Sequence, residues 1–233
     1  MPQLDSKSPR VARRRGRPVG SDSAETRNRI LRAARQVINE RGYHAATFQA
    51  IAVAADLSRP TLHYYFPSRE EIYEALVAEA GGVLADCIGA AKRQRTTIDR
   101  LAALLAAIHE ADSKDRSQIA FLVSARLEAT RNPDLPASTG GALHGFLESL
   151  VVDAKSRGEL SSDTVVTPVT DMLDAMLWGL GFHAGFVNDR AGMILITKQL
   201  GHLLSHGLLE NRGGQPNPAD TFCDTPRSVA GPP

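Results

Sequence analysis

Residues 56–71 of the chain read DLSRPTLHYYFPSREE, and the fold can be worked out from this stretch. The chain contains only one Trp, four Tyr and seven Phe, yet Tyr64, Tyr65, Phe66 and Tyr73 lie close together. Arginines flank these aromatic residues on both sides, and a proline stands where a helix is about to begin. Polar aromatic, hydroxyl, imidazole and guanidinium groups on one short segment are typical of a surface that contacts a polyanion.

The local pattern predicts two short helices joined by a tight turn. Thr47 can cap a helix over 48–55, and the turn follows at 56–58. Because proline fixes its own φ and disfavours helical angles in the preceding residue, we expect the next helix to begin at Pro60, with Arg59 projecting from the cap. Two short helices packed on a first one form a helix-turn-helix, whose second helix can enter the DNA major groove.

Helical periodicity continues on both sides of this unit. The first helix is expected from about Ser23 to Arg41, with Asp22 and Glu25 as a capping pair. A capping box at Ser68–Glu71 opens a long fourth helix. No alternating strand pattern is present, so we predict an all-α fold. The further apolar stripes predict helices at about 98–111, 117–131, 138–157, 165–187 and 190–210.

Charge is divided unevenly along the chain. Residues 1–70 hold 13 Lys and Arg against 6 Asp and Glu, although the whole chain has a net charge of only +1. This division favours a first third that binds a polyanion, while an ordinary solvated basic face explains the charge alone equally well. We expect residues 1–21 to form a disordered basic arm and residues 212–233, rich in Gly and Pro, to form a disordered tail.

Several classes of protein have little support in the sequence. No apolar run approaches the roughly 18 residues that a membrane span needs, and no secretion signal is recognisable. Cys87 and Cys223 are far apart, which favours a reduced, cytoplasmic protein. We find no phosphate-binding glycine loop or nucleophile elbow, so no enzyme and no cofactor is predicted. His202 and His206 are one helical turn apart, but no further ligand completes a metal site.

Residues 25–79 resemble the DNA-binding domain of TetR-family transcriptional regulators. This resemblance implies an all-α protein of about nine helices. A three-helix DNA-binding domain would span 22–80, with its helix-turn-helix at about 48–67, and an effector-binding and dimerisation domain would span 81–211. The positions that carry the likeness are Ile30, Ala33, Ala34, Gly42, Thr47, Ile51, Ala52, Ser58, Thr61, Leu62, Tyr64, Phe66 and Pro67–Glu71.

The resemblance also assigns roles to single residues. Arg59, Thr61 and Tyr64 would face the major groove. Tyr65 and Arg69 would reach backbone phosphates. Thr47, the cap of the second helix, would also contact a backbone phosphate. The full set that we expect to contact DNA is Arg13, Arg14, Arg15, Arg17, Thr47, Ser58, Arg59, Pro60, Thr61, His63, Tyr64, Tyr65 and Arg69.

Three residues depart from the usual family pattern. Asp56 stands where glycine is common, and aspartate tolerates a left-handed conformation better than most residues, so the turn can survive. His63 stands where tyrosine is common, which changes a phosphate or base contact. Pro60 is the third departure. Packing against neighbouring helices remains the alternative role for Tyr64 and Tyr65.

The last two long helices are expected to form a homodimer. Segments 165–187 and 190–210 are too apolar to face water, and the family places its two-fold interface there. A dimer would also present a second recognition helix to a palindromic DNA site.

A small apolar effector is the expected ligand of the second domain. The residues that we expect to bind it are Phe121, Phe146, Met176, Trp178, Phe182 and His183, although side chains at helical spacing can equally be plain core. Gly81 and Gly82 lie inside the predicted fourth helix, where they are costly, and we interpret them as a soft point through which ligand binding changes the tilt of that helix.

The combined interpretation is a sequence-specific transcriptional regulator, a repressor released from a palindromic operator by a small apolar ligand. One alternative is an architectural DNA-binding protein that ignores ligands, and an enzyme is a weaker one. An architectural protein would discriminate weakly between DNA sequences, whereas a regulator should favour its operator by ~10³-fold or more.

The basic arm generates a prediction of its own. Arg13–Pro18 contains an Arg-Gly-Arg-Pro core that resembles an AT-hook, and such a segment can lie in a narrow A·T minor groove. Deleting residues 1–20 should weaken DNA binding and flatten its salt dependence, because fewer phosphates are neutralised. The slope of log affinity against log salt measures this, and an unchanged slope would show that the arm does not touch DNA.

Overall fold

A computed structural model describes residues 19–135, 140–187 and 190–206. The arm residues Arg13, Arg14, Arg15 and Arg17 and the tail over 212–233 therefore lie outside the described residues. All regular structure in the described part is helical, as predicted. The elements are α1 (Val19–Arg41), α2 (Phe48–Ala54), α3 (Arg59–Tyr65), α4 (Arg69–Lys92), α5 (Thr97–Lys114), α6 (Arg116–Arg131), α7 (Gly140–Ser156), α8 (Val166–Phe182), a π-helical turn (His183–Val187) and α9 (Arg190–His206).

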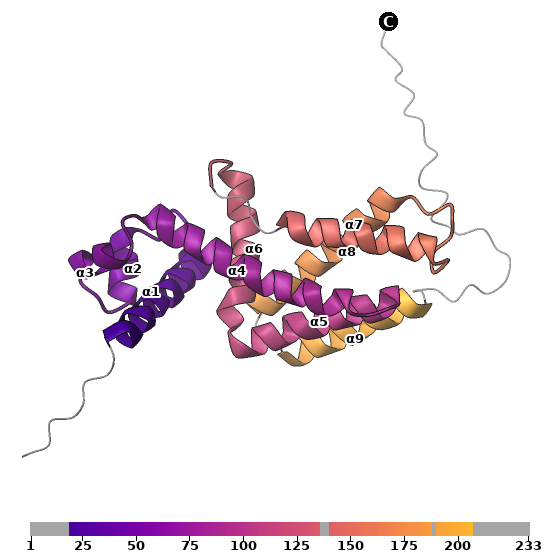
Figure 1. The fold of residues 1–233 in the computed structure, drawn as a ribbon, viewed down its shortest axis with the longest axis horizontal. Coiled ribbons are helices and arrows are strands. Elements are labelled where there is room, and N and C mark those ends of the chain that lie inside the picture. Colours follow the sequence, from indigo (N-terminus) through magenta and orange to yellow (C-terminus); the bar gives the residue numbers. More distant parts are fainter. Residues whose placement is uncertain (1–18, 136–139, 188–189, 207–233) are drawn as a thin grey trace, which may run out of the picture.

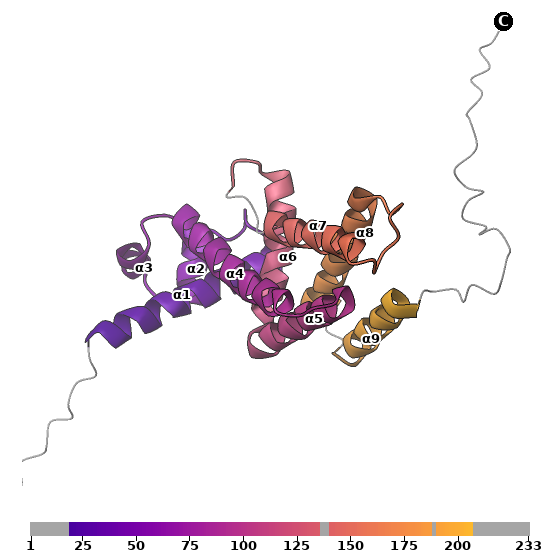
Figure 2. The same ribbon diagram turned by 45° about the vertical axis from the view of Figure 1, so that its right-hand side comes forward.

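The helices form an elongated molecule with a head at one end. Helices α1, α2 and α3 make up the head, and α4 runs from it into the remaining helices (Figure 1). Helices α7 and α8 lie side by side at the other end, while α9 lies along α5 in both ribbon views (Figure 2). Helix α6 passes between the head and the far helices, and it contacts α1, α4, α5 and α8.

Two apolar cores hold these helices together. The first contains Ile51 of α2 and Leu62 of α3, and it also takes in Phe121 of α6. The second contains Leu104 of α5 and Leu150 of α7. Because α6 contributes to the core of the head, the head does not have a core to itself. Among the described residues no helix is long and apolar enough to cross a bilayer.

The predicted caps of α2 and α4 are present. The backbone N–H of Ala50 donates to the hydroxyl of Thr47 (3.1 Å), which caps α2. The N–H of Glu71 donates to the hydroxyl of Ser68 (3.2 Å), so the capping box opens α4 as expected. Asp56 adopts φ +52, the left-handed conformation that the turn requires.

Three details of the predicted elements were wrong. Helix α1 begins at Val19, not at Ser23, so Asp22 lies inside the helix and is not its cap. Helix α3 begins at Arg59, with proline second, because Ser58 is the N-cap and the N–H groups of the first turn need no intrahelical partner. The last α-helical residue of α8 is Phe182, and the chain continues as a wider π-helical turn. Helix α4 is continuous through Gly81 and Gly82, so the two glycines of the predicted soft point do not interrupt the helix.

The turn between α1 and α2 generates a stability prediction. Gly42 adopts φ +79, and a Cβ built there would lie 3.4 Å from Oε1 of Glu128. Gly42→Ala should therefore lower the free energy of unfolding by about 1–2 kcal/mol, because L-residues are strained in this conformation. Gly82→Ala is the matched control, since its Cβ meets nothing within 4 Å on a helix. It should stabilise by about 0.5–1 kcal/mol in urea unfolding, and equal effects of the two changes would contradict the prediction.

Candidate nucleic-acid interface and internal cavity

Helix α3 has an apolar back and a polar front. Leu62 is fully buried, and Phe66, which follows the helix, is 1% exposed. These two side chains fix α3 on the core of the head. The ring of Tyr64, on the opposite side of the helix, is 83% exposed. The exposed front consists of Ser58, Arg59, Pro60, Thr61, His63 and Tyr64.

Several groups on this front already have partners within the head. The hydroxyls of Ser58 and Thr61 lie 2.7 Å apart, and the N–H of Thr61 donates to the hydroxyl of Ser58 (3.2 Å). The ring of His63 lies 4.3 Å from the ring of Phe48, so this imidazole is held against α2. The side chain of Arg59 remains exposed at the start of α3, where a cation is well placed for a base edge or a phosphate.

Arg27 of α1 positions the end of α3, a role that the sequence did not reveal. Its guanidinium lies 4.0 Å from the ring centroid of Phe66 and donates to the backbone carbonyl of Tyr65 (3.3 Å). Tyr65 is half-buried, and its ring is nearly perpendicular to the ring of Tyr64, with the two centroids 5.2 Å apart. Arg27 thus ties α1 to the last carbonyls of α3.

Arg69 stands at the start of α4 on an aromatic support. Its guanidinium lies 4.3 Å from the ring centroid of Tyr43 and 3.1 Å from a carboxylate oxygen of Glu70. A hydrogen bond from its own backbone lowers the pKa of Glu70, and Arg69 lowers it further, so this carboxylate competes with any incoming phosphate. Burial raises the pKa of Tyr43, which keeps its hydroxyl protonated.

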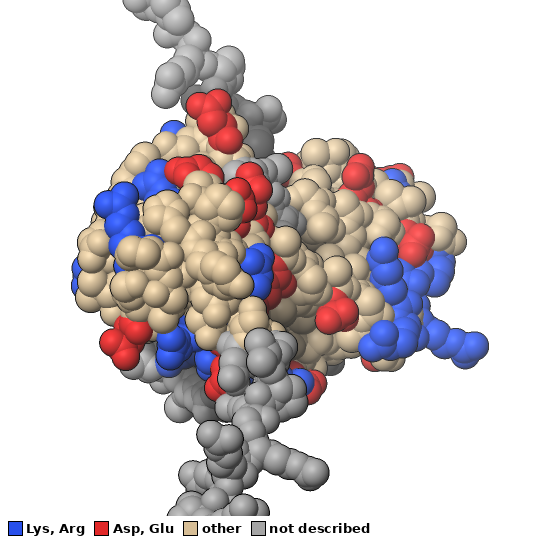
Figure 3. Space-filling model, turned by 60° about the vertical axis from the view of Figure 1, so that its left-hand side comes forward, with Lys and Arg blue, Asp and Glu red and all other residues tan. Residues whose placement is uncertain are grey.

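Basic side chains are not confined to the head. Figure 3 shows Lys and Arg on the head, at the left of the view, and a denser group at the right-hand edge, on the far end of the molecule. The surplus of positive charge expected at the DNA surface therefore depends on the arm over 1–21, most of which lies outside the described residues.

A large apolar cavity lies among α4, α5, α6, α8 and α9. Its volume is about 700 Å³, which is in the range of small-molecule sites. Burial raises the pKa of Cys87 on its wall, so this thiol stays protonated. The polar lining residues are few: His109 and Asp112 on α5, and Thr197 and Lys198 on α9. The apolar lining residues include Val83, Leu84, Ile98, Leu101, Leu105, Ile119, Leu122, Val123, Leu177, Trp178, Met193 and Leu204.

Of the six residues expected to bind the ligand, Trp178 lines this cavity. Phe121 and Phe146 are buried in the two cores, because their helices turn those positions inward. Phe182 is 50% exposed and stacks on Phe186 instead of lining the cavity. Met176 and His183 do not line it either. Sequence reasoning missed the α5 and α9 walls, since periodicity identifies an inward face and not the gap between two such faces.

Trp178 is held by a partly buried ionic network. Its indole N–H donates to Oδ1 of Asp174 (3.0 Å), and Arg126 donates to Oδ2 of the same carboxylate (2.9 Å). The guanidinium of Arg126 also lies 4.5 Å from the indole ring centroid. Asp174 is 7% exposed, and its two partners satisfy the buried charge. The network fixes the indole on the cavity wall.

Residues 30–76 match the family model of bacterial regulatory proteins of the tetR family. This part of the chain is therefore a tetR-type DNA-binding domain. The chain is 28% identical over 170 residues to the transcriptional regulator UidR of Escherichia coli K12, covering 69% of this chain and 82% of UidR. It is 28% identical over 182 residues to the transcriptional repressor BepR of Brucella suis, covering 74% of this chain and 84% of BepR. It is 37% identical over 102 residues to the transcriptional activator FasR of Mycolicibacterium smegmatis, covering 44% of this chain and 45% of FasR.

The TetR-like fold extends over the rest of the described chain. The regulator FadR of Bacillus subtilis, solved in complex with stearoyl-CoA, superposes with a TM-score of 0.62 at 18% identity and covers 78% of this chain and 99% of its own. At this identity the likeness shows the fold alone. The relatives named above are transcriptional regulators, not enzymes.

The exposed front of α3 generates a prediction about DNA affinity. Arg59→Ala should weaken binding to the preferred DNA sequence by about 5- to 150-fold, equivalent to about 1–3 kcal/mol for a lost base contact. The free energy of unfolding should stay within about 0.5 kcal/mol, because the side chain is exposed. Arg95→Ala removes an equally exposed arginine in the α4–α5 turn and is the control. Equal affinities of the two variants in a fluorescence-anisotropy titration would exclude Arg59 from the interface.

Proposed function

We propose that this TetR-family regulator is a homodimeric repressor that leaves a palindromic operator when an acyl-chain ligand fills its cavity. The observation that carries the proposal is the long apolar cavity beside α6, the helix that also completes the core of the head. The arm over 1–21 would add contacts beside the operator. Release by a ligand requires that the ligand bind the DNA-free shape better than the DNA-bound shape.

The cavity has the shape that a chain-like ligand requires. Its lining on α5 runs from Ile98 to Asp112, which is about 21 Å at 1.5 Å per residue. Its lining on α9 runs from Met193 to Leu204, which is about 16 Å. Because α5 and α9 lie alongside one another, these stripes form one elongated groove instead of a round pocket.

The lining chemistry favours an apolar body with one polar end. His109, Asp112 and Lys198 are the residues of the lining that can carry a charge near neutral pH, and the other walls are apolar with few exceptions. A saturated acyl chain satisfies such walls without leaving a polar group unpaired, and a thioester or carboxylate head would meet the polar residues. FadR of Bacillus subtilis, which shares the fold, was solved with stearoyl-CoA, and this supports the same ligand class here.

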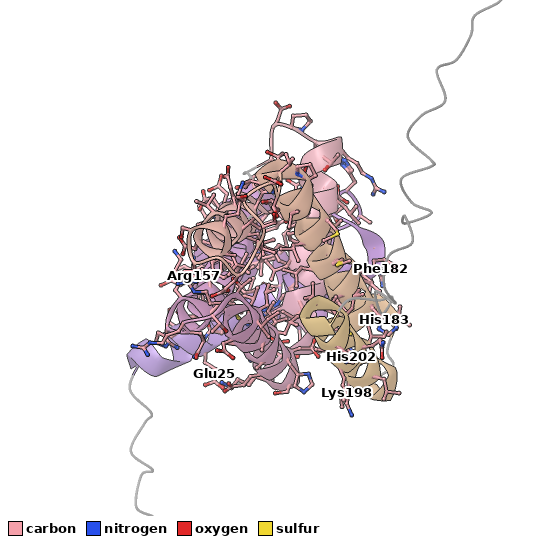
Figure 4. All side chains as sticks on the ribbon, turned by 90° about the vertical axis from the view of Figure 1, so that its right-hand side faces the viewer. Glu25, Arg157, Phe182, His183, Lys198 and His202 are labelled. Atoms are coloured by element: carbon pink, nitrogen blue, oxygen red, sulfur yellow. The ribbon has the colours of Figure 1, made fainter. Side chains whose placement is uncertain are left out.

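A two-fold dimer through α8 and α9 is part of the proposal. The outer face of α8 carries an exposed stripe that repeats every three or four residues, and it extends into the π-helical turn. Leu195 of α9 is 67% exposed and does not line the cavity. Figure 4 shows Phe182 of α8 and His202 of α9 on the same side of the molecule, at the right of the view, which supports a shared face. The α8 stripe consists of Pro168, Met172, Ala175, Gly179, Phe182 and Phe186.

Selection of DNA by the purified chain tests the proposal. We expect duplexes recovered from a random library to contain an inverted repeat, preferred by ~10³-fold or more over unrelated DNA. Sedimentation should find two copies of the chain per site, and transcription from a promoter overlapping the site should fall. A chain that stays monomeric at micromolar concentration, or discriminates weakly, would instead fit an architectural DNA-binding protein.

Binding of the effector can be measured separately by tryptophan fluorescence, because Trp178 is the single tryptophan of the chain and lines the cavity. Saturated acyl-CoA from butyryl to stearoyl should change its fluorescence, with longer chains binding more tightly. Saturation should lower operator affinity by about 5- to 150-fold. Ala102→Phe, which fills the cavity from α5, should abolish the response, whereas Ala85→Phe on the exposed face of α4 should preserve it. No change with any chain length would remove acyl chains as effectors.

A further inference from the structure

We propose that Glu128 of α6 is a positioning residue for the DNA-binding head, through which movement of the cavity wall reaches the phosphate-facing side chains. The carboxylate is 7% exposed although it lies on a helix with a solvent face. Buried carboxylates are rare unless their oxygens have partners. Here both oxygens have a partner in or next to the α1–α2 turn.

The carboxylate holds this turn by its backbone. The N–H of Tyr43 donates to Oε1 of Glu128 (3.4 Å). The side-chain amide of Asn132 donates to Oε2 (3.0 Å), and Nε2 of His44 donates to the side-chain oxygen Oδ1 of Asn132 (3.2 Å). Gly42 approaches Oε1 so closely that a Cβ there would lie 3.4 Å from it. Three successive residues of the turn are thus fitted around the C-terminal part of α6.

The held turn supports groups that face DNA. The ring of Tyr43 lies under the guanidinium of Arg69 (4.3 Å), the arginine at the start of α4. The turn ends at Thr47, which caps α2. Tyr73 of α4 packs edge-on against Tyr43 (4.7 Å). Burial raises the pKa of Tyr73 to about 12, and the negative charge of Glu128 adds to the shift, so these rings and the carboxylate form one buried group.

A second tie holds the other end of α6 to α1. Arg35 of α1 is 3% exposed and pairs with Asp115, the N-cap of α6 (3.2 Å). It also lies 3.8 Å from a carboxylate oxygen of Glu79 on α4. The amide of Asn39 donates to the carbonyl of Ser117 (2.9 Å). With ties at both ends, α6 cannot shift along its length without moving α1 or breaking a buried ion pair.

The opposite side of α6 is a wall of the cavity. Ile119, Leu122 and Val123 all line it. Ala120 lies so close to the π-helical turn that a Cβ on Gly185 would come within 2.8 Å of its Cα. Anything that widens the cavity on this side pushes α6 directly, because packed interiors leave no slack to absorb the change. The contacts of Glu128 transfer that push to the α1–α2 turn.

Substitution at Gly185 tests this link without any ligand, so the result does not depend on the effector proposal. Gly185→Ala acts as a wedge against Ala120 and should lower affinity for the selected operator duplex by about fivefold or more. In a Glu128→Leu background, which keeps the volume but removes both acceptors, the same wedge should change affinity by less than about twofold, the scatter expected of uncoupled sites. Glu128→Gln keeps one oxygen for the N–H of Tyr43 and should restore part of the wedge effect.

Two further variants control for damage to the fold. Gly145→Ala makes the same change on α7, where a Cβ meets nothing within 4 Å, and should leave affinity unchanged. Gly181→Ala is a gentler wedge, since its Cβ would meet a methyl of Val123 at 3.3 Å, and it replaces Gly185→Ala should that variant fail to fold. Hydrogen exchange at the amide of Tyr43 should quicken with either wedge and with Glu128→Leu.

The operator affinities of the wedge variants, with and without Glu128, either support or contradict the proposed role of this residue. Loss of the wedge effect in Glu128→Leu, with faster exchange at Tyr43, supports the link. A wedge effect of equal size with and without Glu128 overturns it and favours transmission through α4 alone. A folded wedge variant that keeps full operator affinity overturns it as well. Failure of every acyl-CoA to release DNA would count against the proposed effector and leave this comparison intact.

Discussion

The structure depends on a constraint of length: α2 and α3 have seven residues each, too few to be stable helices by themselves. Isolated helices shorter than ~12–15 residues are marginal in water, so the DNA-reading helix exists only where a core holds it. That core holds α3 through Leu62 and Phe66, and α6 contributes Phe121 to the same core. The head is therefore physically continuous with the helix that borders the cavity.

This shared core explains how two functions fit on one chain. A head with its own complete core could bind DNA independently of what fills the second domain. Here one face of α6 packs on α1 and the α1–α2 turn, while another face borders about 700 Å³ of apolar space. The second core, around Leu104 and Leu150, borders this space, because Leu101 and Leu177 belong to that core and also line the cavity. Some of the side chains that stabilise the fold are therefore the same ones that a ligand in the cavity would contact.

Much of the DNA side could be predicted, since the deciding signals are local. These signals act over only a few residues: a hydroxyl cap, a residue that tolerates positive φ, and an apolar pair four residues apart. The roles of Thr47 and Asp56 and the buried face of α3 could therefore be predicted from the sequence. The cavity side could not be predicted in the same way. Phe121, Phe146 and Phe182 were reasonable ligand contacts by composition, but two lie in cores and one faces outward. Glu128 has a weak signal in the sequence, because it is an acidic residue on the face of α6 that otherwise carries apolar side chains.

The sequence by itself determined an all-helical chain, the family, the helix-turn-helix and most of the residues on its front. Those properties follow from spacing, capping and turn chemistry, which are settled within a few residues. Only the tertiary structure decided that His63 rests on Phe48, that Arg69 stands on Tyr43, and that α5 and α9 enclose the cavity. These depend on how helices far apart in the chain are rotated and packed against one another, and periodicity along a single helix does not contain that information.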